Sequence, residues 1–263
     1  MNQVTSKDGT TIAFDRSGEG PPIILVNGAL SERSTSAPLA AILAPSLTVF
    51  AYDRRGRGDS GDTPPYAVER EVDDIGALIQ EAGGSAFLFG HSSGAALALE
   101  ATAHGLDVAK LALYESPFIV DDSRPPVPSD YLTSLQEMAS AGRSGDAVEY
   151  FMTVGVGLPG GMVAQMRNAP MWPGLEKVGH TLPYDAAIMG ENMSGKALPD
   201  EWGASVTVPT LVMDGGESPV WQRNSARALA DLLPDAQYRT LAGQTHEVAP
   251  EVLAPVLQEF FSG

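Results

Sequence analysis

Short apolar runs, most of them ended by a glycine or a polar residue, recur along the chain and constrain the fold more than any other feature. Runs that are apolar on both faces are typical of interior strands of a parallel sheet. A more alternating segment precedes them at Thr10–Phe14 and predicts an antiparallel strand. The predicted strands, most of them interior, are Ile23–Val26, Thr48–Tyr52, Ala86–Phe89, Leu111–Tyr114, Thr210–Met213 and Gln237–Leu241.

Segments with helical periodicity lie between these strands. Val68–Ala82 has an apolar stripe and is followed by Gly83-Gly84, which predicts the end of a helix. The other predicted helices are Ala37–Leu43, Ser92–His104, Asn224–Leu233 and Val252–Phe261. Strands that alternate with helices predict an α/β fold, with a mostly parallel sheet and right-handed crossovers.

One long segment interrupts the alternation. From Pro117 to about Thr207 no convincing strand is visible, and seven of the nine methionines lie between Met138 and Met193. Helical periods occur at Tyr131–Ala141 and Asp146–Val154. We therefore predict one sheet domain, formed by residues 1–116 and 208–263, with a helical cap inserted at 117–207.

Charge and composition exclude several classes of function. The chain has 33 acidic and 16 basic residues, a formal net charge of −17, and no cysteine. A surface of this sign is repelled by nucleic acid and by anionic lipid, and the lack of cysteine excludes disulfides, thiolate metal sites and cysteine nucleophiles. No secretory signal or apolar run of about 20 residues is visible. We therefore expect a cytoplasmic protein, monomer or homodimer, whose partner is a small molecule rather than nucleic acid or a membrane.

The segment Gly90-His91-Ser92-Ser93-Gly94 matches the pattern G-x-S-x-G and lies between a predicted strand and a predicted helix. A reversal from strand to helix in so few residues forces the serine into a strained backbone conformation at the N-terminus of a helix. There the partial positive charge of the helix favours an oxyanion. The alternative is a glycine-bounded helix cap. We interpret Ser92 as a nucleophile, because only Ser92 has glycine two residues before and two residues after it.

With this motif the chain resembles an α/β-hydrolase with a helical cap, and the resemblance covers essentially the whole sequence. Val26-Asn27-Gly28-Ala29 stands where that family has a His-Gly turn, with asparagine replacing the histidine. Asp53-Arg54-Arg55-Gly56-Arg57-Gly58-Asp59-Ser60 is similar to the family loop D-x-x-G-x-G-x-S, and Gly243 to His246 is similar to the late histidine loop. The resemblance implies that the backbone N–H groups of Ala29 and Ser93 form an oxyanion hole.

A serine nucleophile needs a base with a pKa near neutrality, which histidine supplies. His246 fits the family order of serine, acid and histidine; the alternative is a surface histidine in a loop. In the family the acid usually lies a few residues after the strand that corresponds to Thr210–Met213, and in this sequence that place falls on Ser218, which has no charge. Glu115 is the favoured acid, because a carboxylate at the end of an interior strand is costly to bury without a partner, and some haloalkane dehalogenases carry a glutamate at that place. Asp214 and Glu217 remain alternatives.

We predict a serine hydrolase that cleaves an ester, lactone or thioester of a small, mainly apolar metabolite through an acyl-enzyme. No metal or organic cofactor is expected. The two G-x-G-x-x-G matches, at 56–61 and 155–160, do not indicate a dinucleotide site, because they lack the helix that such a site needs. The alternatives are a non-hydrolytic or C–C bond-cleaving enzyme of the lyase type that uses the same three residues, and a homologue that binds a ligand without turnover. Residues predicted to line the substrate site are Asn27, Gly28, His91, Met152, Trp172 and His180.

Overall fold

A computed structural model describes residues 1–262 and contains one mixed eight-stranded sheet. The strand order is β1-β2-β4-β3-β5-β6-β7-β8. Strand β2 pairs antiparallel with both β1 and β4, and all the other neighbouring pairs in this order are parallel. All seven predicted strands are present. The strands are β1 (Asn2–Thr5), β2 (Thr11–Ser17), β3 (Pro22–Val26), β4 (Thr48–Tyr52), β5 (Ala86–His91), β6 (Val108–Tyr114), β7 (Thr210–Gly215) and β8 (Ala236–Leu241).

Strand β1 was not predicted. It lies at the edge of the sheet, and of its four residues only Val4 is half-buried while the others are exposed. Its pairing with β2 therefore rests on main-chain hydrogen bonds, which leave no apolar run in the sequence. A short polar edge strand of this kind has no hydrophobic pattern that could predict it.

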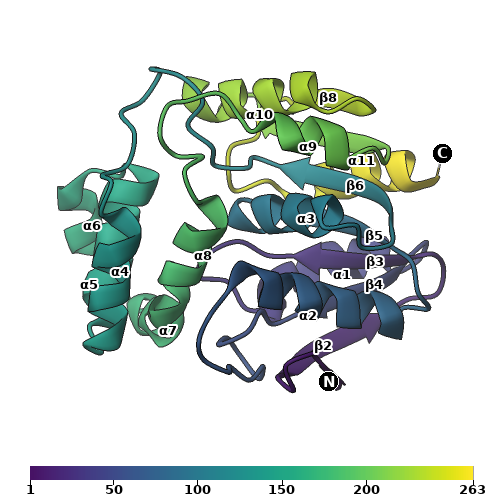
Figure 1. Ribbon diagram of the computed structural model, residues 1–263, viewed down its shortest axis with the longest axis horizontal. Helices are drawn as coiled ribbons and strands as arrows, with labels where there is room; N and C mark the ends of the chain where they lie inside the picture. Colours follow the sequence, from purple (N-terminus) through teal and green to yellow (C-terminus); the bar gives the residue numbers. More distant parts are fainter. Residues whose placement is uncertain (263) are drawn as a thin grey trace.

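Helices cover both faces of the sheet, as Figure 1 shows. One face packs against α2, α3 and α10, and the other packs against α1 and α11. The α3 helix is apolar on nearly all sides and is buried for most of its length. These helices are α1 (Ala37–Leu43), α2 (Val68–Glu81), α3 (Ser93–Ala103), α10 (Val220–Leu232) and α11 (Pro250–Ser262).

The segment between β6 and β7 is helical wherever the structure assigns it an element. Most of these helices gather beyond the carboxyl ends of the parallel strands, on the left in Figure 1. They share a core of their own around Leu135, Val148 and Trp172. The elements are α4 (Tyr131–Ser140), α5 (Ser144–Tyr150), the π-helical turn η2 (Phe151–Val156), α6 (Gly160–Met166), α7 (Trp172–Val178), the 3₁₀ turn η3 (Gly179–Thr181), α8 (Leu182–Met189) and α9 (Asp200–Ser205).

The last part of this segment packs with the sheet instead. Trp202 of α9 lies against Phe118, with 5.2 Å between the ring centroids, and both belong to the core cluster that contains α2 and α3. We call α4, α5, η2, α6 and α7 the outer helices. Helix α8 contacts both these helices and the sheet, because Leu182 and Ala186 pack with the outer helices while Ile188 and Met189 pack with the core of the sheet. Helix α8 thus connects the outer helices to the sheet next to α3.

Candidate active site

Ser92 connects strand β5 to helix α3 in a strained conformation, with φ 59° and ψ −130°. The left-handed φ is costly for a residue with a side chain and occurs at functional turns. Glycines make the close packing of this turn possible. A Cβ on Gly90 would lie 2.5 Å from Ala95 Cα, and one on Gly94 would lie 2.1 Å from the carbonyl oxygen of Val26. The G-x-S-x-G sequence therefore builds the sharp reversal that it predicts.

The turn after β3 runs directly past Ser92. A Cβ on Gly28 would lie 2.8 Å from Ser92 Cβ and 3.4 Å from Ser92 Oγ, so only glycine fits there. The side chain of Asn27 faces inward: its Oδ1 accepts a hydrogen bond from Ser36 (2.6 Å), and its Nδ2 donates to the carbonyl of Glu32 (3.2 Å). The turn thus brings the backbone at Gly28 next to Ser92, and the Asn27 side chain holds the loop.

Glu115 and His246 are in contact, although they are 131 residues apart in the sequence. His246 Nδ1 lies 2.8 Å from Glu115 Oε2, and the backbone N–H of Gly215 donates to Glu115 Oε1, also at 2.8 Å. The Glu115 side chain is fully buried, and its backbone has a left-handed φ of 49° directly after β6. Burial alone would raise the pKa of Glu115, but the hydrogen bonds from His246 and the Gly215 N–H, together with the nearby Ser218 hydroxyl, outweigh it and hold that pKa below its usual range.

Three further contacts hold the His246 loop. Tyr114 Oη donates to the carbonyl of Thr245 (2.6 Å), and His91 Nε2 lies 3.0 Å from the carbonyl of His246. Burial and the neighbouring His246 lower the pKa of His91 to about 4, so His91 is neutral at pH 7 and its Nε2–H can donate. The side-chain amide of Gln222 lies 3.0 Å from His246 Nδ1 and, with its oxygen turned toward the ring, can accept the same N–H as Glu115. Sequence reasoning missed Gln222, because a polar residue near the start of an amphipathic helix is common and does not indicate a site.

The other candidate acids lie elsewhere. Asp214 is buried at the end of β7, and its Oδ2 accepts a hydrogen bond from Tyr238 Oη (2.5 Å). Glu217 is exposed. Ser218 is buried and faces Glu115. Of the carboxylates weighed from the sequence, only Glu115 touches His246 in residues 1–262.

The basic segment after β4, residues 54–57, is paired with carboxylates. Arg54 makes two hydrogen bonds of 2.7 Å to Glu71, and Arg55 bonds Asp74 at 2.8 and 2.7 Å. Arg57 pairs with a carboxylate of α8. All these side chains are buried, so the segment is part of the interior rather than a basic surface.

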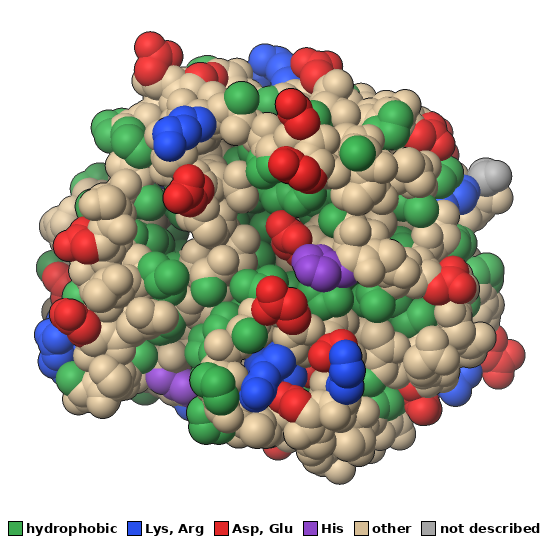
Figure 2. Space-filling view, in the orientation of Figure 1, with side chains coloured by type: hydrophobic (Ala, Val, Ile, Leu, Met, Phe, Trp, Pro, Cys, Tyr) green, Lys and Arg blue, Asp and Glu red, His purple; other side chains and the backbone are tan. Residues whose placement is uncertain are grey.

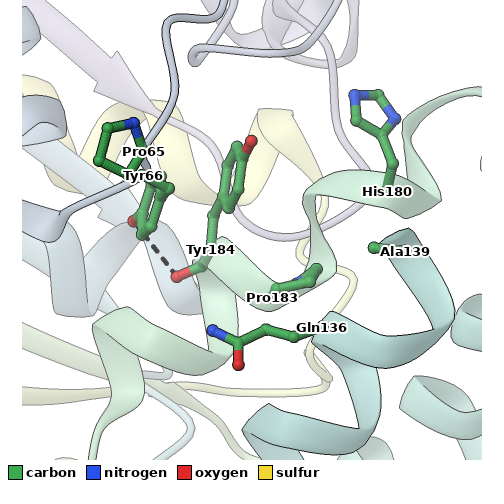
Figure 3. Close-up of a pocket in the computed structure, with 7 residues that line it drawn as sticks. All are labelled: Pro65, Tyr66, Gln136, Ala139, His180, Pro183 and Tyr184. Atoms are coloured by element: carbon green, nitrogen blue, oxygen red, sulfur yellow. Dashed lines mark hydrogen bonds between the residues drawn. The ribbon is translucent and has the colours of Figure 1, made fainter. Parts of the chain in front are cut away.

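Three of the predicted substrate residues belong to the outer helices. Met152 and Trp172 are buried in the core of these helices, and Trp172 Nε1 donates to Glu176 (2.7 Å). His180 lines a separate cavity of about 460 Å³, which Figure 3 shows together with Pro65, Tyr66, Gln136, Ala139, Pro183 and Tyr184. Of the six predicted substrate residues, the structure places Gly28 and His91 beside the serine or the histidine, and a role for the other four stays a prediction.

Figure 2 shows a hollow between the outer helices and the sheet domain, with hydrophobic side chains around it and a histidine near it. Within residues 1–262 no group of three or more His, Asp or Glu side chains is arranged to hold a metal ion. In the same range no helix is both long and apolar enough to span a membrane.

Comparison with known proteins places this arrangement in a family. The sequence model of the alpha/beta hydrolase family matches residues 23–256. The crystal structure of an alpha/beta hydrolase from Sphaerobacter thermophilus is 62% identical, with a TM-score of 0.92 over 99% of this chain and 100% of that chain. The 2-(acetamidomethylene)succinate hydrolase of Mesorhizobium japonicum is 26% identical over 95% of this chain and 91% of its own length, and a non-heme haloperoxidase of Rhodococcus erythropolis is 26% identical over 94% and 93%. The chain is an enzyme and belongs to the alpha/beta hydrolase family.

Proposed function

We propose that this enzyme is a serine hydrolase that cleaves an ester, lactone or thioester of a small, mainly apolar metabolite through an acyl-enzyme. The observation that carries the proposal is the strained Ser92 turn near the His246–Glu115 pair. His91 links the two parts, since it precedes Ser92 and its ring lies 4.8 Å from that of His246. A hydroxyl, an imidazole and a buried carboxylate are the three groups that this chemistry requires.

In the proposed mechanism the contact between Glu115 and Nδ1 of His246 fixes the tautomer of the imidazole. With Nδ1 protonated, Nε2 is free to take the proton of Ser92 Oγ while that oxygen attacks the carbonyl carbon. Nε2 then returns the proton to the departing alcohol, and the acyl group stays on Ser92. In the second half, Nε2 takes a proton from water while the water oxygen attacks the acyl carbon. The bond between the acyl carbon and Ser92 Oγ then breaks, Oγ takes the proton back from Nε2, and the acid product leaves.

The negative charge on the carbonyl oxygen needs donors that are already in place. We assign this role to the backbone N–H groups of Ala29 and Ser93. Ser93 is the first residue of α3, where N–H groups are free of helical partners and the helix end is partly positive. Ala29 follows Gly28, which touches Ser92. Donors of this kind, aimed at the developing charge, contribute about 10²–10³-fold each to turnover.

An apolar acyl or alcohol group fits the surroundings of the site. The hollow between the outer helices and the sheet domain has hydrophobic side chains around it (Figure 2). Ala29 and Leu30, which follow Gly28, pack against the core of the outer helices and join the site to it. The methionines of these helices are unbranched and adapt to different ligand shapes.

The test combines labelling of the serine with a substrate series. A fluorophosphonate is expected to label the wild type at Ser92, as located by peptide mass spectrometry, and to leave Ser92→Ala unlabelled. Turnover of p-nitrophenyl esters with increasing acyl length is expected in the wild type and not in Ser92→Ala or His246→Ala, while the control His104→Ala, at an exposed helix end, stays active. The same panel includes 2-(acetamidomethylene)succinate, the compound that the hydrolase of Mesorhizobium japonicum is named for. A wild type that neither labels nor turns over any ester would refute the proposal.

A further inference from the structure

A buried group of charges joins helix α8 to the segment after strand β4. Asp185, in the first turn of α8, accepts hydrogen bonds of 2.6 Å from Arg57 Nη2 at Oδ2 and from Arg54 Nη1 at Oδ1. The side chains of Arg54 and Arg57 are at most 1% exposed and that of Asp185 is 4% exposed. Asp185 is the only carboxylate that bonds Arg57 in the part of the chain that the structure describes. A buried guanidinium needs such a partner.

Arg57 also reaches the turn that passes the nucleophile. Its Nη1 donates to the carbonyl oxygen of Gly28 at 2.7 Å. That oxygen and the N–H of Ala29 belong to one peptide unit, which is planar and trans, so the two point in opposite directions. By holding the carbonyl, Arg57 sets the direction of the Ala29 N–H. A cationic donor on the carbonyl also polarises the peptide and strengthens its N–H as a donor.

The same carboxylate holds the other side of the oxyanion hole. Ser93 Oγ donates to Asp185 Oδ1 at 2.8 Å, and Ser93 directly follows the nucleophile. Asp185 is therefore bonded to the segment of one proposed oxyanion donor directly and to that of the other through Arg57. Both donors are fixed by one side chain of α8, a helix that lies between the outer helices and the sheet.

We propose that Arg57 and Asp185 are positioning residues of the oxyanion hole, which makes the docking of helix α8 on the sheet a condition for turnover. This inference rests on the proposed function, because it needs Ala29 and Ser93 to be the oxyanion donors. Neither side chain touches the reacting atoms in this assignment. Loss of either is expected to slow the chemical step and to leave substrate binding nearly unchanged.

The neighbouring pair Arg55–Asp74 provides a matched control. It belongs to the same arginine segment, its side chains are at most 1% exposed, and its bonds are 2.7 and 2.8 Å long. Arg55 also bonds Asp8 and the carbonyl of Arg70. These contacts lie on the side of α2 and the N-terminal strands, and none of them involves residues 27–29 or 92–93. Asp74→Asn therefore removes a buried charge of the same kind without touching the oxyanion hole.

The experiment compares Asp185→Asn with Asp74→Asn for kcat, KM, thermal unfolding and the rate of fluorophosphonate labelling. We expect Asp185→Asn to lower kcat and the labelling rate by about 10–100-fold, somewhat less than the loss of a whole oxyanion donor. KM should stay within about twofold and the pH profile should keep its shape, because the Ser92, His246 and Glu115 side chains are intact. Asp74→Asn should keep kcat within about threefold of the wild type, even if its melting temperature falls as much as that of Asp185→Asn.

A second pair of variants covers the case in which Asp185→Asn does not fold. Ser93→Ala removes only the hydroxyl bond to Asp185, and Arg57→Lys keeps the charge but loses the forked contact to Asp185 and Gly28. Both are expected to lower kcat more than KM. Equal losses of kcat in Asp185→Asn and Asp74→Asn, or an unchanged kcat in Asp185→Asn, Ser93→Ala and Arg57→Lys, would overturn the inference. Failure of the proposed function gives a different result, since the wild type itself would then not label at Ser92.

Discussion

Replacing Glu115 with glutamine tests the contact on which the proposed mechanism depends most. Glu115 Oε2 lies 2.8 Å from His246 Nδ1, and Oε1 accepts the backbone N–H of Gly215. Glutamine has nearly the same shape, so its side-chain oxygen can keep the bond to Gly215. Its amide NH₂ then faces Nδ1 and favours the tautomer with the proton on Nε2, which cannot accept the proton of Ser92.

The magnitude follows from the charge that is lost. When His246 becomes an imidazolium during the reaction, an ion pair at 2.8 Å gains about 6 kcal/mol at an effective dielectric constant of about 20. The side chain of Glu115 is 0% exposed but that of His246 is 33% exposed, so solvent screens part of this attraction. We therefore expect about 4–5 kcal/mol, which corresponds to a fall in kcat of about 10³–10⁴-fold.

The assay is the steady-state hydrolysis of the best p-nitrophenyl ester at neutral pH, with circular dichroism to check the fold. Asp214→Asn serves as the control, because Asp214 is just as buried but bonds Tyr238 rather than His246. Its kcat should stay within about threefold of the wild type. A Glu115→Gln variant that keeps more than a tenth of the wild-type kcat, or an Asp214→Asn variant that loses a thousandfold, would refute the reasoning.

Two predictions concern stability. Gly94→Ala would place a Cβ 2.1 Å from the carbonyl oxygen of Val26 and should lower the free energy of unfolding, measured in urea, by about 1–3 kcal/mol or more. Gly174→Ala, in helix α7 with open space around it, should raise that free energy by about 0.5–1 kcal/mol. Equal effects of the two substitutions would contradict this account. The pKa of Glu115 is lowered in the folded state, so its stabilisation is complete above the unfolded pKa of about 4.3 and is lost as the pH falls through the folded value. The free energy of unfolding of the wild type should therefore approach that of Glu115→Gln as the pH falls below the unfolded pKa of about 4.3 and through the lower folded value. A difference that grows on acidification would contradict the assigned direction.

The sequence predicted the sheet well, because each interior strand is a short apolar run with a clear end. Strand β4 has the predicted bounds, Thr48–Tyr52, and the strained turn at Ser92 lies where the glycines of 90–94 place it. Helix α10 begins at Val220, four residues before the predicted start, because Pro219 supplies its N-terminal boundary. Patterns of this kind are local, so a single sequence is enough to show them.

The contacts around the site were harder to predict because they join distant segments. Asp185 lies among apolar residues, which indicates a buried charge in need of a partner, but nothing in the local pattern points to Arg57, which lies 128 residues away. Gln222 gives no such signal. The bond between Glu115 and His246 is equally distant, yet Glu115 could be proposed from its place, since a carboxylate that ends an apolar strand must be compensated.

The place of Glu115 also explains why position 218 holds a serine. Strand β6 pairs with β5, so Glu115 follows the strand next to the one that carries Ser92, and the N–H of Gly215 at the end of β7 binds its second oxygen. Ser218 faces the same carboxylate. A second carboxylate at position 218 would stand beside Glu115 and raise its pKa, as like charges do in a shared site. A neutral hydroxyl at position 218 avoids that repulsion, so the carboxylate directly after β6 and the serine in the loop after β7 suit each other.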